Sequence, residues 1–500
     1  MKVLLIYPPV TVYQEAHIDP HPPLGLAYLA AYLRENNVEV KILDALALGI
    51  KNRKKVGKKT RVGMSAGEIK KYLRDFKPDL VGVGVMFTPY AKDAHEVAGL
   101  VKSVNPKTMV VFGGAHVSID PKLVLKDKNV DVAVKGEGEI TLLGLVQALQ
   151  KKRKLTRLTG IAYCQGRKII QNPPSPFIKN LDELPFPARD LLPLDVYDDL
   201  DEPFAMRHPL TAMVTSRGCP GRCVYCAIHS IWGHTWRGRS AKKVVDEIEH
   251  LINDFGIKEI HFQDDSMSIN KARMNKICDE IIKRKLDIKW TTPNGIAHWT
   301  LDKKLIKKMK RAGCYRLTFG IESGNPEMRK WLGKPHSLEQ AKQLTQYANK
   351  IGLWTIATNI LGFPYETKQQ IEDTINFAIN SDVDFALFYR LAPRWGTPVY
   401  EVFKKEGLLP KDETAIYGEG SACDTKVFTK EELVKIRNEA HQRFLKYRLR
   451  SFINPARLIR KINSWEDFCY LSRLGFSGLK MAWGMAQLGA KKATSKTFRG

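Results

Sequence analysis

The sequence has 500 residues and a formal net charge of +27, from 80 Lys and Arg against 53 Asp and Glu. Hydrophobic residues make up 44% and charged residues 27%, which is typical of folded proteins and excludes collagen-like, coiled-coil, mucin-like and wholly disordered chains. No apolar run approaches the roughly 18 residues of a membrane-spanning helix, and Met1–Ile6 resembles a first strand more than a signal peptide. We therefore expect a cytoplasmic protein of several domains.

Residues 1–150 alternate between short apolar runs and amphipathic segments. The apolar runs predict strands at Val3–Tyr7, Val38–Leu43, Asp79–Met86, Met109–Phe112 and Val130–Val134. The segments between them predict helices at Leu24–Arg34, Ala66–Phe76, Ala91–Val104 and about Ile140–Leu149. This alternation is typical of an α/β fold with a parallel, doubly wound, Rossmann-like sheet. Ligands of such sheets bind in the loops at the carboxyl ends of the strands.

The rest of the chain divides into three parts. Residues 151–205 are rich in prolines and polar turns and predict a linker. The β/α alternation resumes in residues 206–400, with strands predicted at Thr211–Ser216, Glu259–Gln263, Lys289–Thr292, Arg316–Gly320, Trp354–Leu361 and Ala386–Leu391. Six such strands predict a partial (β/α)6 barrel with its chemistry at the carboxyl ends of the strands. Residues 401–500 are predicted to be a helical, basic C-terminal region.

Three of the eight cysteines lie together after the first predicted barrel strand. Cys219, Cys223 and Cys226 have the spacing Cys-x3-Cys-x2-Cys, and eight cysteines are too few for a disulfide scaffold. Three thiolates on one short loop suit an iron–sulfur cluster that keeps one iron open, whereas structural zinc normally takes four protein ligands. A zinc knuckle or a chance group of core cysteines is the alternative.

With Tyr225 just before its last cysteine, this loop resembles that of the radical S-adenosylmethionine (SAM) enzymes. The resemblance implies a 4Fe–4S cluster whose open iron is chelated by SAM, and reductive cleavage of SAM to a 5′-deoxyadenosyl radical. Four further segments match the family in order, namely Phe262–Asp265, Phe319–Gly324, Leu361–Thr367 and Pro393–Pro398. The matching positions that the resemblance assigns to SAM binding are Tyr225, Gln263, Asp264, Asp265, Glu322, Ser323, Gly362 and Pro364.

Two of these segments depart from the family pattern or allow a simpler interpretation. Many members carry Gly-Gly-Glu where this chain has Gln263-Asp264-Asp265, although carboxylates there suit the SAM ammonium group. The two aspartates are also plausible N-cap residues of a helix. The segment Gly362-Phe363-Pro364-Tyr365-Glu366-Thr367 is equally compatible with a turn followed by an N-cap threonine.

In this family a doubly wound domain before the barrel usually binds cobalamin, and residues 1–150 resemble that arrangement. The positions implied for cobalamin are Thr88, Gly113, Gly114, His116, Gly136 and Glu137. The signature Asp-x-His-x-x-Gly is missed by one residue at Asp19-Pro20-His21, which argues against His21 as an axial ligand. A degenerate domain without cobalamin is the alternative. A dinucleotide site is disfavoured because Gly82-Val83-Gly84 lacks the third glycine of that motif.

The resemblance predicts a cobalamin-dependent radical SAM enzyme that methylates an unactivated carbon of a hydrophobic or natural-product-like substrate. The sequence names no catalytic residue beyond the cofactor sites. Alternatives are an anaerobic oxidative cyclase, another radical rearrangement, an RNA-modifying enzyme, or a non-catalytic iron–sulfur protein. Nucleic acid is disfavoured as a partner because no cysteine precedes Cys164, where methylthio-transferring relatives carry additional cluster ligands. A reductant such as flavodoxin or ferredoxin is expected.

Two basic zones account for much of the excess positive charge. One spans residues 51–61, and the other comprises Arg443, Lys446, Arg448, Arg450, Arg457, Arg460 and Lys461, followed by an apolar segment, Met481–Met485, and Lys491-Lys492. Basic residues beside aromatic ones suit peripheral contact with an anionic membrane and a lipid-like or tetrapyrrole-like substrate. A solvated basic surface is the simpler interpretation.

Overall fold

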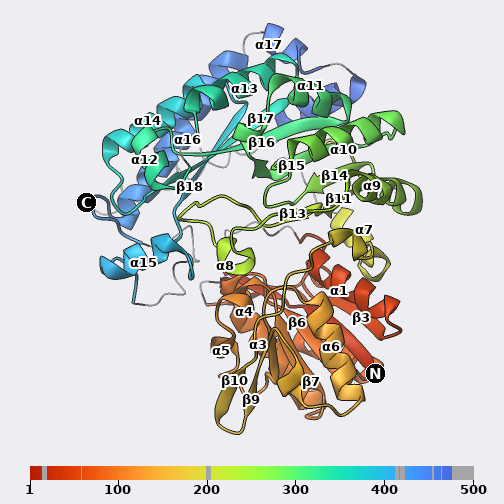
Figure 1. Cartoon of the computed structure of the whole chain (residues 1–500). Coiled ribbons are helices and arrows are strands. Elements are labelled where there is room, and N and C mark those ends of the chain that lie inside the picture. The colour runs from red at the N-terminus through yellow and green to blue at the C-terminus, as the bar shows by residue number, and fades with distance from the viewer. Residues whose placement is uncertain are drawn as a thin grey trace.

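The computed structural model describes residues 1–13, 18, 20–57, 59–198, 204–334, 336–411, 416, 423–452, 455–462 and 464–475. They form two lobes, each built around its own sheet (Figure 1). The first lobe contains a seven-stranded sheet of order β10-β9-β8-β7-β6-β1-β3 and the second a six-stranded sheet of order β11-β14-β15-β16-β17-β18. This confirms the predicted α/β fold with a doubly wound sheet followed by a partial barrel.

The first lobe is doubly wound because its strands are apolar on both faces. Its parallel strands are β1 (Lys2–Tyr7), β3 (Glu39–Asp44), β6 (Leu80–Gly84), β7 (Met109–Gly113) and β8 (Val132–Val134). One face is covered by α1 (Leu24–Glu35) and α6 (Glu139–Gln150), and the other by α2 (Ala66–Phe76) and α3 (Ala91–Val104). Two short helices, α4 (Ala115–Ile119) and α5 (Pro121–Val124), follow β7.

Two segments of this lobe differ from expectation. Part of the predicted linker forms β9 (Ile161–Gln165) and β10 (Lys168–Gln171), which extend the sheet because β9 pairs antiparallel with β8 and buries Ile161 and Tyr163. The basic zone at residues 51–61 forms β4 (Arg53–Val56) and β5 (Lys59–Val62), which pair with β2 (Val10–Tyr13) in a small antiparallel sheet. Short antiparallel additions carry no β/α rhythm, so the sequence pattern does not reveal them.

The six strands of the second lobe are all parallel. They are β11 (Leu210–Met213), β14 (Glu259–Phe262), β15 (Lys289–Ile296), β16 (Cys314–Glu322), β17 (Trp354–Leu361) and β18 (Phe385–Arg390). Because β11 and β18 are the two edges of the sheet, the barrel is open. The predicted first strand is split, since β11 ends at Met213 and β12 (Ser216–Arg217) pairs antiparallel with β13 (Arg237–Gly238).

Helices cover the outer face of this sheet (Figure 1). They are α9 (Ala241–Phe255), α10 (Lys271–Lys283), α11 (Lys303–Arg311), α13 (Leu338–Lys350), α14 (Lys368–Asn380) and α16 (Lys430–Phe452). The shorter helices are α7 (Leu194–Asp198), α8 (His229–Trp232), α12 (Pro326–Trp331), α15 (Pro398–Lys405) and α17 (Pro455–Ile459), and residues 465–475 are also helical. Near the middle of α9, the buried Glu247 lies between the guanidinium groups of Arg189 and Arg239.

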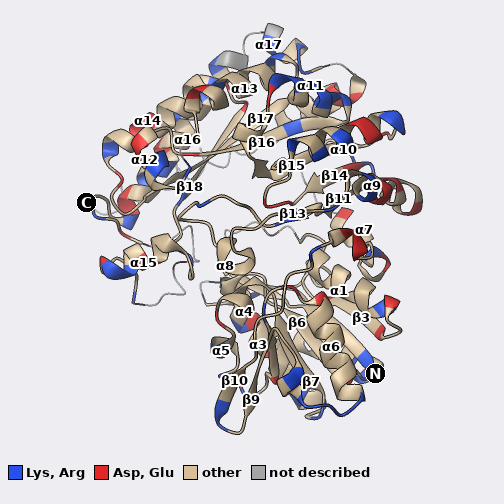
Figure 2. Cartoon of the chain, viewed as in Figure 1, with Lys and Arg blue, Asp and Glu red and all other residues tan. Residues whose placement is uncertain are grey.

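Many basic residues of the C-terminal zone face other parts of the protein. Arg443 binds Glu372, Arg457 binds Asp382 and Asp384, and Lys461 reaches Asp384 at 2.7 Å with both side chains buried. Figure 2 shows both signs of charge along outer helices such as α9, α10 and α14. These pairs remove much of the charge that suggested membrane contact. The apolar segment Met481–Met485 and Lys491-Lys492, for which membrane contact was also considered, lie outside the described residues. Among the helices that are described, none is long and apolar enough to span a membrane.

Candidate active site at the junction of the lobes

The three cysteines lie on a loop, residues 218–226, that follows β12; we call it the cysteine loop. Gly218 begins it with φ +86°, where a Cβ atom would overlap the carbonyl oxygen of Thr235. Its far end is fixed by two backbone hydrogen bonds, from Val224 N to the carbonyl of Leu332 (3.1 Å) and from Val399 N to the carbonyl of Val224 (3.0 Å). The loop is therefore held at both ends by backbone geometry.

The thiols of this loop are grouped without converging on one point. A Cβ atom on Gly221 would lie 3.4 Å from the Cys219 sulfur and 3.9 Å from that of Cys223, so this glycine leaves the space between the two sulfurs open. Within the described parts of the chain, no set of three His, Cys, Asp or Glu side chains is arranged around a single metal ion. A cubane cluster binds each of three thiolates on a different iron, a ligand set that this loop supplies, whereas structural zinc takes four protein ligands.

Burial affects the titration of these thiols. It raises the pKa of the Cys219 thiol and raises that of Cys226 to about 11. The thiols of Cys219 and Cys226 are therefore protonated at neutral pH when no metal is bound, and a metal centre must displace those two protons.

Glu322, at the end of β16, has a φ of +67° and forms an ion pair with Lys334, whose Nζ lies 3.1 Å from Oε1. A Cβ atom on Gly320 would lie 2.7 Å from that Oε1 and 3.0 Å from the Lys334 nitrogen, so the glycine makes room for the pair. A left-handed backbone at a non-glycine residue is strained, and such strain is concentrated at functional sites. Sequence reasoning found Glu322 but missed Lys334.

Three of the predicted SAM residues hold other parts of the protein. Asp264 is buried, and its carboxylate accepts hydrogen bonds from Thr215 N, Thr215 Oγ1 and Ser216 Oγ at 2.5–3.0 Å. Asp265 accepts from Gly218 N at 2.8 Å, and burial raises its pKa to about 6. Ser323 is fully buried and its Oγ lies 3.2 Å from Thr374 Oγ1.

The two aspartates therefore fix the start of the cysteine loop, and both Asp264 and Ser323 are buried. Gln263 is only partly buried, and its backbone carbonyl accepts a hydrogen bond from the Asn294 side chain.

The turn after β17 packs behind the cysteine loop. Gly362 has φ +90°, and the carbonyl of Pro364 accepts a hydrogen bond from Lys426 N. The ring centroid of Phe363 lies 6.3 Å from that of Tyr225. Glu366 is fully buried, and its Oε2 accepts from Gly362 N at 2.7 Å and Phe363 N at 3.3 Å.

Most of the residues predicted for cobalamin lie together at the carboxyl edge of the first sheet. His116 Nδ1 is 3.1 Å from Thr88 Oγ1, and burial lowers the pKa of His116 to about 4, so its ring is neutral. Gly114 has φ +108°, where a Cβ atom would lie 2.7 Å from the carbonyl oxygen of Val85, and Gly136 has φ +80°. The ring of His116 lies 6.4 Å from that of Trp395, in the other lobe.

Glu137 has a different environment from that expected for a cobalamin residue. Its carboxylate is bound by Arg217 (2.6 Å) and Arg237 (2.9 Å) of the second lobe and by the backbone N–H of Ile178 (2.6 Å). We therefore assign Glu137 to the junction between the lobes. His21 is exposed, and Asp19 of the imperfect signature lies outside the described residues.

Comparison with known proteins agrees with this geometry. A family model described as a B12 binding domain matches residues 19–146, and one described as the radical SAM superfamily matches residues 213–378. An uncharacterised methyltransferase of Pyrococcus horikoshii is 36% identical over 471 residues, which cover 94% of this chain and 96% of the relative. The chain belongs to the cobalamin-binding radical SAM enzymes.

Other members of this family differ in what they do. Cytidylyl-2-hydroxyethylphosphonate methyltransferase of Streptomyces wedmorensis is 30% identical over 447 residues, 83% of each chain. Anaerobic magnesium-protoporphyrin IX monomethyl ester cyclase of Rubrivivax gelatinosus is 28% identical over 413 residues, 81% of this chain and 70% of the cyclase. The structure of the radical SAM methyltransferase TsrM of Kitasatospora setae superposes with a TM-score of 0.67 at 20% identity, covering 81% of this chain and 75% of TsrM, and supports the fold.

The cofactors of this radical SAM enzyme are a 4Fe–4S cluster, SAM and cobalamin. The described residues fit them. The cysteine loop offers three thiols, two of which lie beside Gly221, and the first lobe offers two glycines with positive φ and a neutral histidine. Sequence reasoning missed Arg217, Arg237 and Lys334. The two arginines act through partners that are distant in the sequence, and Lys334 lies outside every motif.

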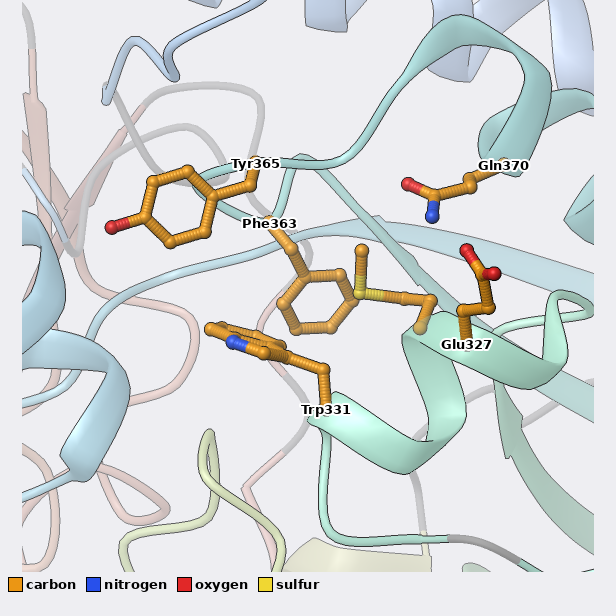
Figure 3. A pocket seen from close by; sticks show the side chains of 6 residues that line it. Glu327, Trp331, Phe363, Tyr365 and Gln370 are labelled. Carbon is orange, nitrogen blue, oxygen red and sulfur yellow. The ribbon is translucent and has the colours of Figure 1, made fainter.

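A small cavity lies behind the turn after β17. It is lined by Glu327, Met328, Trp331, Phe363, Tyr365 and Gln370, with a volume of about 200 Å³. Figure 3 shows the rings of Trp331, Phe363 and Tyr365 on one side and Glu327 and Gln370 on the other. The volume is below the roughly 300–1,000 Å³ of typical small-molecule sites, so this cavity alone does not hold SAM or a corrin.

Proposed function

We propose that this enzyme transfers a methyl group to a carbon atom of a small molecule bound between the lobes. The observation that carries the proposal is the direct contact between the two cofactor-binding regions. Arg217, the residue before the cysteine loop, forms buried ion pairs with Glu137, in the loop that follows β8, and with Glu139, the first residue of α6. Both cofactor-binding regions therefore border one junction. Two relatives that are at least 30% identical and cover over 80% of the chain are named methyltransferases, which supports methyl transfer over cyclisation.

We assign the sites at this junction as follows. Cys219, Cys223 and Cys226 bind the cluster, while Tyr225, Gln263, Asp265, Glu322, Gly362 and Pro364 surround SAM. Thr88, Gly113, Gly114, His116 and Gly136 border cobalamin. When bound, these cofactors supply a 5′-deoxyadenosyl radical and a methyl group.

Within the SAM site, Lys334 and Asp265 have supporting roles. Lys334 holds the Glu322 carboxylate in place from 3.1 Å. Asp265 holds the first turn of the cysteine loop through Gly218 N. Asp264 acts one step further away, by fixing Thr215 and Ser216.

The inner face of β18 supports a hydrophobic or aromatic substrate. Ala386 and Phe388 are buried toward the outer helices, whereas Leu387 and Tyr389 are 37% and 51% exposed. Residues in a strand alternate between faces, so Leu387 and Tyr389 point into the open barrel. Burial, and to a smaller extent the charge of Glu322, raises the pKa of Tyr389, which supports a position of this phenol on the same side of the barrel as Glu322. Large exposed hydrophobic side chains beside a site are typical of ligand contact. A lipid-like or tetrapyrrole-like substrate fits this surface, and we propose a flavodoxin or ferredoxin as the electron source.

The products of SAM distinguish methyl transfer from the alternatives. Reconstituted, cobalamin-loaded enzyme is incubated anaerobically with dithionite and SAM, and 5′-deoxyadenosine and S-adenosylhomocysteine are quantified. A methyltransferase forms both, because a second SAM remethylates cobalamin, whereas a cyclase forms 5′-deoxyadenosine without S-adenosylhomocysteine.

Cys223→Ala is the matched control, and it should lose the brown colour and 5′-deoxyadenosine together. Formation of 5′-deoxyadenosine alone by fully loaded enzyme would refute the methyltransferase proposal. Retention of colour and cleavage by Cys223→Ala would refute the cluster assignment.

A further inference from the structure

Four charged side chains form a buried cluster where the lobes meet, and we call it the latch. It comprises Glu137, Glu139, Arg217 and Arg237. Arg217 contacts Glu137 at 2.6 Å and Glu139 at 2.5 Å, and Arg237 contacts Glu137 at 2.9 Å. The side chains are between 3% and 12% exposed, so the cluster is largely shielded from water and salt.

The latch joins segments that are far apart in the sequence. Glu137 lies in the loop between β8 and α6, and Glu139 is the first residue of α6. Arg217 and Arg237 lie opposite each other on the paired strands β12 and β13, and Figure 1 shows β13 between the two sheets. The carboxylates are thus supplied by the cobalamin lobe and the guanidinium groups by the barrel lobe, 78 to 100 residues later.

The geometry of the latch favours one arrangement of the lobes. Arg217 directs one terminal nitrogen to each of two different carboxylates, which fixes the plane of its guanidinium group. Arg237 also donates to the Ile178 carbonyl, and its guanidinium carbon lies 4.8 Å from the Phe177 ring centre and 5.7 Å from that of Trp232. Buried, mutually compensated ion pairs add little net stability relative to apolar contacts but define register and orientation.

Each side of the latch is adjacent to a cofactor-binding segment. Arg217 directly precedes Gly218 and the first cluster cysteine, Cys219, and Glu137 directly follows Gly136 of the cobalamin site. A shift of either latch residue is therefore transmitted through one or two peptide bonds to a residue that borders a cofactor.

We propose that the latch sets the position of the cysteine loop relative to the cobalamin lobe, with Glu139 and Arg217 as positioning residues for the reaction that joins the two cofactors. The proposal depends on the cofactors of the family and not on the identity of the methyl acceptor. A failure of the latch proposal and a failure of the methyl-transfer proposal can therefore be distinguished.

Two variants weaken the latch with little change in side-chain volume. Glu139→Gln removes one of the two carboxylate charges on Arg217. Arg217→Lys keeps the positive charge, but a single ammonium group lacks the planar fork that bridges two carboxylates. Asp190→Asn is the matched control, because it breaks a bidentate ion pair with Arg34 in which both side chains are about half exposed.

The test measures the magnetic interaction between the two cofactors. Holoenzyme is loaded with cob(II)alamin, its cluster is reduced with dithionite, and electron paramagnetic resonance records the splitting or broadening that each unpaired spin causes in the other. This interaction falls with the cube of the distance, so it reports the relative position of the sites without any substrate. Iron and cobalamin contents are measured on the same samples.

We expect Glu139→Gln and Arg217→Lys to keep at least half of the wild-type iron and cobalamin. The splitting that each unpaired spin causes in the signal of the other should weaken several-fold in both variants or spread over a wider range of values. Asp190→Asn should match the wild type. Spin interactions identical to wild type in both latch variants would overturn the proposal. Iron loss in proportion to the loss of interaction would also overturn it, because the latch would then support only the local fold of the cysteine loop.

Discussion

Replacing Glu366 by glutamine tests whether the turn after β17 contains a carboxyl group that keeps its proton up to about pH 7 in the folded protein. Burial raises the pKa of Glu366 from its ordinary value of 4.5 to about 7, although the N–H groups of Gly362 and Phe363 oppose this by favouring the charged form. Its Oε1 is buried and has no hydrogen-bond partner in the described structure. Ionisation in the folded protein is therefore costly.

The size and sign of the effect follow from the two pKa values. Between pH 4.5 and 7 the unfolded chain releases this proton while the folded chain keeps it, so the free energy of unfolding falls as pH rises. The full difference corresponds to about 3 kcal/mol, of which roughly 2 kcal/mol appears between pH 5 and pH 8. Glu366→Gln cannot ionise, so relative to wild type it should gain roughly 2 kcal/mol of stability over that range.

The assay is urea denaturation of anaerobically purified protein at several pH values, followed by circular dichroism. Glu327→Gln, an exposed change on α12 beside the same cavity, is the control and should keep the wild-type pH dependence. A constant difference between Glu366→Gln and wild type from pH 5 to pH 8 would show that Glu366 ionises normally, and the reasoning would then fail.

Three further substitutions test other parts of the structure. In Gly333→Ala, a Cβ atom would overlap the backbone of the cysteine loop, so iron content should fall at least several-fold while circular dichroism is retained; full iron content would contradict this. In Gly320→Ala, the new methyl group would displace the Glu322 carboxylate, so equilibrium dialysis should show SAM binding about tenfold more weakly with iron content unchanged. Unaltered SAM binding would show that Glu322 does not belong to the SAM site. Glu247→Gln leaves two buried arginines without their carboxylate and should cost about 3–5 kcal/mol, seen as a thermal midpoint lower by about 3–5 °C; a shift below about 1 °C would contradict a buried charged triad.

The parts of the fold that the sequence predicts well are those encoded locally. The strands β1 and β7 follow from continuous apolar runs, and the cysteine loop follows from three residues within eight positions. Local patterns of this kind need no knowledge of distant partners. The sequence predicts a linker where β9 and β10 extend one side of the sheet, since β9 depends on pairing with β8, and β10 on pairing with β9, rather than on their own composition.

The roles of individual polar residues were harder to predict because they depend on partners far along the chain. Asp264 and Glu137 occupy the expected segments, yet their carboxylates bind Thr215 and Arg217. Lys334 lies outside every motif and reaches Glu322 only because α12 turns back toward β16. Residue type and motif position locate a site, but the direction of each side chain depends on tertiary contacts.

The polar character of the seam between the lobes has a consequence for biosynthesis. When the first lobe leaves the ribosome, the barrel arginines, 78 or more residues later, have not yet been made. Glu137 and Glu139 then face water as ordinary solvated carboxylates. This part of the seam therefore exposes charge instead of an apolar patch to which chaperones or neighbouring nascent chains would bind. The half-made polypeptide is thereby protected from aggregation at this seam until Arg217 is translated.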